Sequence, residues 1–378
     1  MSGGSSTASS ASNAGAFMPF SGSYRQGDVQ FLLRRLPGHA FVSVEEKEAL
    51  IQSGQRHYSE MLSAERLPSA RHLALFDEAC QANRGRMAAD CLRLAHLVAA
   101  RRSGQITLVS LARAGTPVGV VVRHLLERVL HRDAVHYSVS IVRDRGIDEA
   151  ALRTILAGHV PASIVFIDGW TGKGVIAREL ERSVERFNVQ HRVRIDAGLF
   201  VLSDLAGAAA CASSDADYLI PSSILNATVS GLVSRTVVNG GTGQGDYHGC
   251  VYYKEFAAHD RSQAFADDIV AAALEIAEAG ELAAVPVDRA RAAATSRACL
   301  RDLAERHGVA DVNLIKPGIG EATRVLLRRV PRLLILRDPD AADVAHLKLL
   351  AQEKEVPVVV DRALPYQGVS LIRREGDA

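Results

Sequence analysis

The chain has 378 residues, of which 48% are hydrophobic, and its formal net charge is +1. This length favours two or three domains, and the apolar content provides a buried core and excludes a disordered chain. The nearly neutral balance also excludes an overall basic field. Any contact with nucleic acid would therefore need a local patch of charge.

Five cysteines, an odd number, are scattered along the chain and form no C-x-x-C pair. Such spacing is typical of a reducing cytosol and argues against a disulfide scaffold or a structural zinc site. Residues 1–20 are rich in Ser, Gly and Ala, which indicates a disordered tail without a signal peptide. No apolar run approaches the ~20 residues that span a bilayer. We therefore expect a cytoplasmic protein.

Helical patterns dominate the first hundred residues after this tail. A cap followed by acids starts a helix at Ser43 that we expect to end near Ser53. A longer helical pattern runs from Ser69 to about Arg102. Between them, the polar and aromatic residues 56–61 are interpreted as the edge of a helix with ordinary surface polarity.

Strand and helix patterns alternate from residue 106 onward. We expect strands at 106–110, 135–142, 164–167 and 199–202. We expect helices at 120–130, 175–187 and 262–281, and a further helix that follows residue 148 and ends near residue 158. This alternation predicts an α/β fold with parallel β-α-β units, in which ligands bind at the carboxyl ends of strands. Two glycine-containing loops, at 111–119 and 168–174, follow such ends.

The loop at 168–174 reads Asp-Gly-Trp-Thr-Gly-Lys-Gly, and a helical pattern begins directly after it at Val175. The first N–H groups of a helix are free and lie at its positive dipole end, so this loop suits an anion, with Lys173 beside it. It is not a Walker A loop, because Ile167 and Gly174 stand where that motif needs Gly and Ser or Thr. It is not a G-x-G-x-x-G fingerprint either. The alternative is a plain tight turn.

Both loops resemble those of type I phosphoribosyltransferases. The later one resembles the phosphoribosyl-diphosphate loop, although Gly169 stands where that family has a second acid, and the earlier one resembles the pyrophosphate loop. The resemblance implies a transferase that uses Mg²⁺ and the catalytic residues Asp168, Arg113 and Lys173. It also implies that the phosphates are bound by Ala114, Gly115, Thr116, Gly169, Trp170, Thr171, Gly172 and Gly174.

Four strings together, at 110–119, 136–148, 168–174 and 218–235, resemble a bacterial family of phosphoribosyltransferase-like proteins found with tellurite-resistance and stress genes. The resemblance implies one domain over residues 21–290 that transfers or releases phosphoribose at a nitrogen acceptor. The acceptor side would be lined by Tyr218, Ser222, Ser223, Asn226 and Arg235. Members of this family are also labelled StiP-type cysteine proteases.

A cysteine protease needs a histidine near its nucleophile and an oxyanion hole. His248 lies two residues before Cys250, and side chains at this spacing share a face of a strand. This pair is the protease alternative, whereas Cys211 lies in a loop of small residues. A lone cysteine is usually a small buried hydrophobe.

The last part of the chain, residues 291–378, alternates helix and strand and predicts a second α/β domain. Its string at 318–324 resembles the G-x-N-E-x-T-K motif of the ribosomal kink-turn-binding superfamily, in its pelota-like branch, with Gly320 in place of the Asn. The resemblance implies RNA contacts by Lys316, Glu321, Thr323 and Arg324, with Arg328, Arg329 and Arg332 on phosphates. The alternative is a solvated basic helix.

Three functions follow from these patterns. The main hypothesis is a phosphoribosyltransferase-like enzyme of a stress system, and the rivals are a StiP-type cysteine protease and a non-enzymatic, nucleotide-sensing RNA-binding protein. The patterns indicate no membrane partner.

Overall fold

The computed structural model describes the chain except for residues 1–19, 239–245, 281, 284, 286 and 374–378. Nearly all of the predicted tail at residues 1–20 therefore lies outside the described residues, and so do residues 239–245, a glycine-rich stretch of sequence shortly before His248. None of the described helices is long and apolar enough to cross a membrane.

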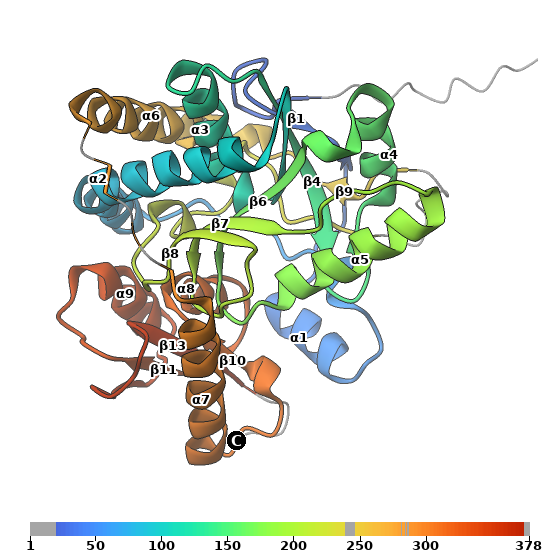
Figure 1. The fold of residues 1–378 in the computed structure, drawn as a ribbon. Helices are drawn as coiled ribbons and strands as arrows, with labels where there is room; N and C mark the ends of the chain where they lie inside the picture. Colours follow the sequence, from blue (N-terminus) through green and yellow to red (C-terminus); the bar gives the residue numbers. More distant parts are fainter. Residues whose placement is uncertain (1–19, 239–245, 281, 284, 286, 374–378) are drawn as a thin grey trace, which may run out of the picture.

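A seven-stranded sheet forms the centre of the molecule (Figure 1). Its strands pair in parallel, except that the short β5 (Gly146–Ile147) runs antiparallel to β4. The remaining strands, in spatial order, are β1 (Gln30–Phe31), β4 (Ala134–Val142), β3 (Ile106–Ala112), β6 (Ile164–Thr171), β7 (Leu199–Asp204) and β8 (Cys211–Ser214). The α/β class with a mostly parallel sheet is therefore confirmed.

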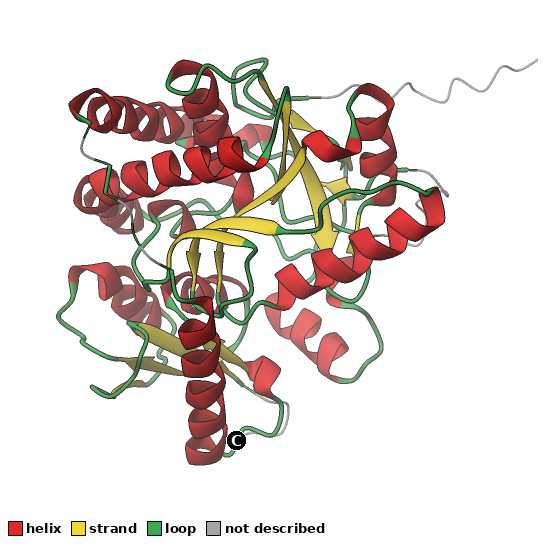
Figure 2. Ribbon diagram, in the orientation of Figure 1, coloured by secondary structure: helices red, strands yellow, loops and turns green. Residues whose placement is uncertain are grey.

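Helices cover both faces of this sheet, so the domain has three layers (Figure 2). One face is covered by α2 (Ala70–Arg101), α3 (Gly115–Arg128) and α6 (Ser262–Ala279). The other is covered by α4 (Glu149–Gly158) and α5 (Val175–His191). Apolar strands buried on both faces, such as β6, are what a parallel sheet between two helical layers requires.

The C-terminal part forms a second sheet of four strands, in the spatial order β10, β13, β11 and β12. The strands are β10 (Ile315–Pro317), β13 (Gly368–Ile372), β11 (Pro331–Leu336) and β12 (Val358–Val360). One face packs on α7 (Arg289–His307), and the other packs on α8 (Ile319–Arg328) and α9 (Ala345–Glu353). The apolar side chains of α8 and α9 belong to the same core as α2, so these helices lie between the two sheets.

Two short elements complete the chain. Helix α1 (Val44–Gln52) reaches the C-terminal part through an ion pair of 2.6 Å between Glu48 and Arg329. A small parallel pair joins β2 (Arg34–Arg35) to β9 (Gly249–Cys250). The polar cluster expected to be a helix edge contains a 3-10 turn at Tyr58–Glu60.

The structure corrects several boundaries. Strand β6 extends through Thr171, because β7 supplies hydrogen-bonding partners as far as Asp204, so half of the predicted loop is strand. Helix α3 begins at Gly115, where Pro117 suits the first helical turn. Residues 312–314 are a 3-10 turn before β10. Cys211, expected in a loop, begins strand β8.

Candidate active site

The two glycine loops meet where the strand order reverses. Strand β3 lies between β4 and β6, and the chain passes from β4 to β6 across it, which makes the carboxyl ends of β3 and β6 a switch point. The loops touch there, since a Cβ atom on Gly115 would lie 2.5 Å from the carbonyl oxygen of Ile167. The prediction that both loops follow the carboxyl ends of strands is confirmed, and the structure adds that these strands, β3 and β6, are neighbours.

Asp168 is buried at this junction. Its Oδ1 atom accepts a hydrogen bond of 2.8 Å from the backbone N–H of Gly169. Burial raises the pKa of Asp168 to about 6, against the opposing effect of the positive charge of Arg324. The carboxyl group therefore faces the C-terminal domain rather than open solvent.

The loop after Asp168 is covered by that domain. A Cβ atom on Gly172 would lie 2.7 Å from Cγ of Glu321 and 2.9 Å from the carbonyl oxygen of Pro317. The guanidinium of Arg324 stacks over the Trp170 ring, with its Cζ atom 4.4 Å from the ring centroid. Lys173 donates from Nζ to the carbonyl oxygen of Val312 at 2.7 Å. Burial lowers the pKa of Lys173 to about 7. The expected phosphate cradle is thus filled by protein.

Beside this loop lies a group that we call the arginine cluster: Arg113, Arg235 and Arg328, with Asn226 and Glu65. Arg113 pairs with Glu65 at 2.6 Å, and it also donates to Oδ1 of Asn226 at 3.0 Å. The same oxygen accepts from Nε of Arg328 at 3.0 Å. Burial and the charge of Arg113 lower the pKa of Arg328 well below its usual value. The cluster joins the two domains through the amide oxygen of Asn226, which accepts from both Arg113 and Arg328, while Glu65 pairs with Arg113 inside the larger domain.

Other predicted site residues have structural partners of their own. Thr116 hydrogen-bonds Ser138 at 2.8 Å, and Thr171 donates to Asp204. Arg235 donates to the carbonyl oxygens of Tyr58, at 3.0 Å, and Met61. Gly174, in a left-handed conformation with φ of 69°, caps α5.

The expected acceptor side is divided between two places. Asn226 and Arg235 belong to the arginine cluster, whereas Tyr218 lies under the guanidinium of Arg86, which is 4.0 Å from its ring centroid. Ser222 and Ser223 are buried, and their hydroxyls have no hydrogen-bond partner among the described residues. Ala114 precedes the first turn of α3. The structure does not bring these residues to one surface.

His248 and Cys250 lie on the edge of the same small strand pair. Their carbonyl oxygens accept from Arg34 at 2.9 Å and from Leu36 at 2.8 Å, so both residues follow one extended register and place their side chains on the same face. Nδ1 of His248 lies 2.8 Å from Oγ of Ser140. Cys250 has 0% exposure, and burial raises the pKa of its thiol to about 12.

The predicted RNA residues are engaged in contacts within the molecule, some with the larger domain and others inside the C-terminal domain. Thr323 is fully buried and lies 2.8 Å from Nε2 of His346. Glu321 pairs with Arg324 at 2.7 Å over Trp170 and Gly172. Lys316 is partly buried, and its desolvation lowers its pKa. Arg328 donates to the side-chain oxygen of Asn226, and Arg329 pairs with Glu48. Arg332 donates to the carbonyl oxygen of His307. The expected RNA face is occupied by intramolecular contacts.

No group of three or more His, Cys, Asp or Glu side chains is gathered for a metal ion in the described part of the chain. Asp168 contributes a single carboxylate at its strand end, and Gly169 stands beside it. These residues do not fit a Mg²⁺ site by themselves. The expectation of Mg²⁺ stays a prediction that depends on a diphosphate ligand.

The sequence patterns did not predict two residues that bind site side chains: Glu65, which pairs with Arg113 in the arginine cluster, and Ser140, which contacts His248. Glu65 follows the polar residues 56–61, which were interpreted as ordinary surface, yet it is the carboxylate of the arginine cluster. Ser140 lies within a strand pattern and gave no signal of its contact with His248. A charge inside an apolar context, such as Arg235 among residues 227–237, was the available signal.

Comparison with known proteins identifies relatives of both parts. Residues 22–270 match the family described as tellurite-like stress resistance cysteine protease StiP, and residues 294–374 match the PELOTA RNA binding domain. The chain is 43% identical over 368 residues to "Cysteine protease StiP" of Acinetobacter baylyi, an alignment that covers 94% of this chain and 95% of that protein.

These matches contradict the transferase hypothesis. A relative aligned over nearly the whole length is named a cysteine protease, and nothing in the comparisons indicates phosphoribosyl transfer. The structure gives physical reasons in the same direction, since Glu321 and Pro317 fill the space over Gly172 and the second acid is absent at Gly169. The transferase activity that we inferred from the two loops was therefore wrong.

Proposed function

The chain belongs to the StiP family, and from this premise we propose that it is a cysteine protease in which Cys250 is the nucleophile and His248 its base. The observation that carries the assignment is the shared face of these two residues at β9. Of the five cysteines, Cys250 is the one with a histidine two residues away. The pair is the alternative that the sequence also indicated.

Hydrogen bonds around His248 support its role as a base. Ser140 donates its hydroxyl proton to Oγ1 of Thr236 at 2.8 Å, so toward His248 its oxygen is an acceptor. Nδ1 of His248 therefore carries the proton, and the lone pair lies on Nε2. Asp148 accepts from the backbone N–H of His248 at 2.6 Å and adds negative charge nearby. This is the logic of a base oriented by a third group.

The chemistry then follows ordinary thiol catalysis. Nε2 of His248 takes the proton of the Cys250 thiol, and the thiolate attacks the peptide carbonyl carbon to form a thioester. The amine leaves with the proton from the imidazolium, and water hydrolyses the thioester to regenerate the thiol. Because the buried thiol is protonated at neutral pH, the described arrangement is a resting one. Catalysis requires Cys250 to move out of the core.

Thiol alkylation tests this function. The full chain is expected to release peptides from denatured casein, and iodoacetamide is expected to stop that release in step with modification of Cys250, followed by mass spectrometry. Without substrate, the raised thiol pKa predicts slow alkylation whose rate rises about tenfold per pH unit from pH 7 to 9. Peptide release that persists after Cys250 is fully modified contradicts the proposal.

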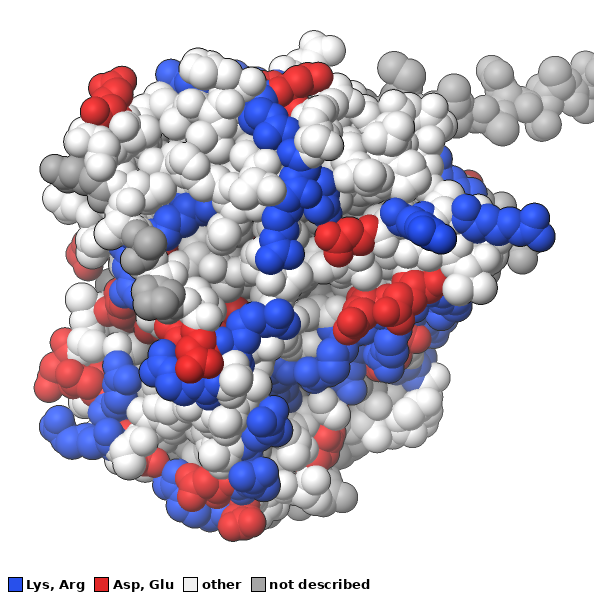
Figure 3. All heavy atoms as spheres, viewed as in Figure 1, with Lys and Arg blue, Asp and Glu red and all other residues white. Residues whose placement is uncertain are grey.

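We further propose that the C-terminal domain binds RNA, and the match of residues 294–374 to the PELOTA RNA binding domain supports this second candidate. On the face seen in Figure 3, basic and acidic side chains are interspersed rather than gathered by sign. The α8 residues expected to contact RNA pack on Trp170, so binding through them requires the domains to separate.

Filter binding of single-stranded RNA by the full chain tests this candidate. We expect the logarithm of the affinity to fall linearly with the logarithm of salt concentration, and Arg324→Ala to weaken binding. Trp170 is the only tryptophan, so separation of α8 from it is expected to shift its emission to longer wavelength. Arg301→Ala, on the exposed face of α7, is the matched control. Salt-independent affinity, or unchanged emission on binding, contradicts this mode.

The finer fold assignment is also a proposal. The parallel strand order and the two loops at the β3–β6 switch point support a phosphoribosyltransferase-like sheet for the larger domain. Fold and activity are separable, because function resides in the site rather than in the architecture. The assignment therefore implies ancestry of the scaffold and no transfer reaction.

A further inference from the structure

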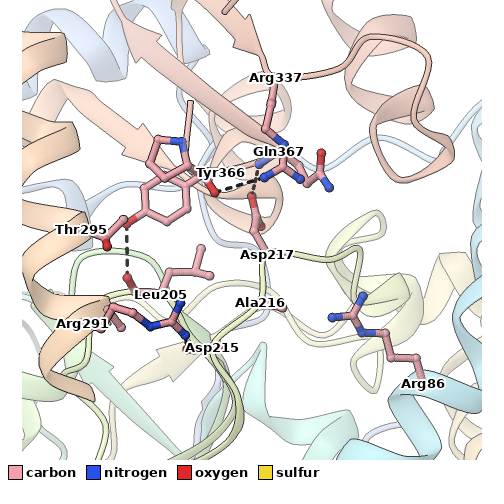
Figure 4. A pocket seen from close by; sticks show the side chains of 12 residues that line it. Arg86, Leu205, Asp215, Ala216, Asp217, Arg291, Thr295, Arg337, Tyr366 and Gln367 are labelled. Carbon is pink, nitrogen blue, oxygen red and sulfur yellow. Dashed lines mark hydrogen bonds and ion pairs between the residues drawn. The ribbon is translucent and has the colours of Figure 1, made fainter. Parts of the chain in front are cut away.

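A cavity of about 380 Å³ lies between the two domains (Figure 4), and neither His248 nor Cys250 is among the residues that line it. Its walls come from α2, from the segments after β7 and β8, from α7, and from the C-terminal segments that follow β11 and precede β13. Its lining includes five charged side chains and one aromatic ring: Arg86, Asp215, Asp217, Arg291, Arg337 and Tyr366. The volume falls within the range of small-molecule sites in proteins.

The two carboxylates of the cavity are already engaged. Asp215 pairs with Arg291 at 2.8 Å. Asp217 accepts from the backbone N–H groups of Ile319 at 2.9 Å and Gln367 at 2.8 Å, which ties the C-terminal domain to the loop after β8. In Figure 4, Asp217 and its partner Gln367 lie near Arg337. Arg291 and Arg86 lie on opposite sides of the cavity.

Two guanidinium groups at this cavity lack a carboxylate partner. Within the described residues, neither Arg86 nor Arg337 has a carboxylate oxygen at ion-pair distance. Asp90, whose pKa is affected by Arg86, is held by Arg93 at 2.6 Å. Arg337 acts on Asp217 only at longer range, and its Nη1 donates to the carbonyl oxygen of Pro365 at 3.4 Å. Each guanidinium therefore keeps donors for a ligand.

The rest of the wall is mostly apolar, and Thr295 and Gln367 are its polar members. Hydrocarbon surface comes from Leu205, Ala216, Ala292 and Pro365. Tyr366 adds its ring, and its hydroxyl donates a hydrogen bond of 3.2 Å to the carbonyl oxygen of Leu205. A ligand that fits needs an anionic end for the arginines and a compact, less polar body for this wall.

We propose that this cavity binds a small phosphate monoester, with the phosphate between Arg86 and Arg337 and the organic part against Tyr366 and Leu205. Two guanidinium groups without carboxylates match the two negative charges of such a group, and their planar forks suit phosphate oxygens. The ligand would contact both domains. The site is independent of peptide hydrolysis, so it goes beyond the proposed function and does not depend on it.

Calorimetry on the full chain tests the proposal, with glycerol 3-phosphate as the probe. Glycerol serves as the neutral control and succinate as the dicarboxylate. We expect binding of glycerol 3-phosphate that Arg86→Gln and Arg337→Gln each weaken about tenfold or more. Arg301→Gln, an exposed arginine of α7 outside the cavity, is expected to leave the affinity unchanged.

The outcomes separate cleanly. Because Arg337 also contacts Pro365, Arg337→Lys is included; it keeps the charge without the fork and is expected to show intermediate affinity with unchanged circular dichroism. Absence of binding by the wild-type chain, equal or tighter binding of succinate, or wild-type affinity for glycerol 3-phosphate in either glutamine variant would overturn the proposal. Casein hydrolysis by the same variants is expected to be unchanged, which keeps this test apart from that of the protease.

Discussion

Replacing Cys250 by serine is expected to reduce casein hydrolysis about a thousandfold or more, because a hydroxyl cannot replace a thiolate as the nucleophile of a thiol protease. His248→Gln is expected to cause a loss of similar size, since the thiol proton then has no acceptor. The double variant should lose little beyond either single one, because residues that act as a unit are not additive. Initial rates of peptide release measure all three.

Cys211→Ser provides the matched control, because Cys211 is also a buried strand cysteine, with 7% exposure. A serine hydroxyl in the core costs stability, so each variant is compared by thermal unfolding before its rate is interpreted. Cys250→Ser that hydrolyses casein at the wild-type rate, or Cys211→Ser that is inactive although folded, would show that the nucleophile was wrongly assigned.

The sheet and its helices could be predicted because their patterns are local. The run of apolar residues at 164–167 is buried on both faces, and the spacing after Val175 is helical, so strand, loop and helix follow from the chain itself. Strands such as β8 and β13 have weaker local sequence patterns, so they are harder to predict as strands. Small residues in β8 suit several conformations, and only its pairing with β7 makes it a strand.

The site was harder to predict because it depends on contacts between distant parts of the chain. The loop at 168–174 has the composition of an anion site, and nothing in its own sequence indicates that Glu321, about 150 residues later, covers Gly172. The pairing of Arg113 with Glu65 likewise joins two segments of ordinary appearance. In contrast, His248 and Cys250 are neighbours in sequence, and strand geometry alone placed them on one face.

Substitution of Glu65 by glutamine is expected to lower the stability of the domain interface by about 3–5 kcal/mol, the usual cost of leaving a buried charge without its partner. Glu65 is the carboxylate of the arginine cluster, and its side chain is only 13% exposed. Without its charge, Arg113 and Arg328, which share the amide oxygen of Asn226, repel each other, and the charge of Arg235 adds to this repulsion. Since Arg328 comes from the C-terminal domain, the repulsion pushes the two domains apart.

Trp170 makes this loss measurable, because the tryptophan lies under Arg324 at the same interface. In urea, the emission of Trp170 is expected to change at a lower concentration in Glu65→Gln than in the wild type, before the loss of helical circular dichroism. Glu60→Gln is the matched control. Glu60 pairs with Arg145 at 2.8 Å, but its side chain is 29% exposed, so its removal should cost less than about 1 kcal/mol.

Added sulfate distinguishes charge repulsion from a simple packing defect. A divalent oxyanion that binds Arg113 replaces the missing carboxylate, so sulfate is expected to restore more stability to Glu65→Gln than sodium chloride does at equal ionic strength. The Glu60→Gln variant should respond equally to the two salts. If Glu65→Gln is as stable as the wild type, or if both salts act alike on it, the arginine cluster does not hold the domains together through this carboxylate.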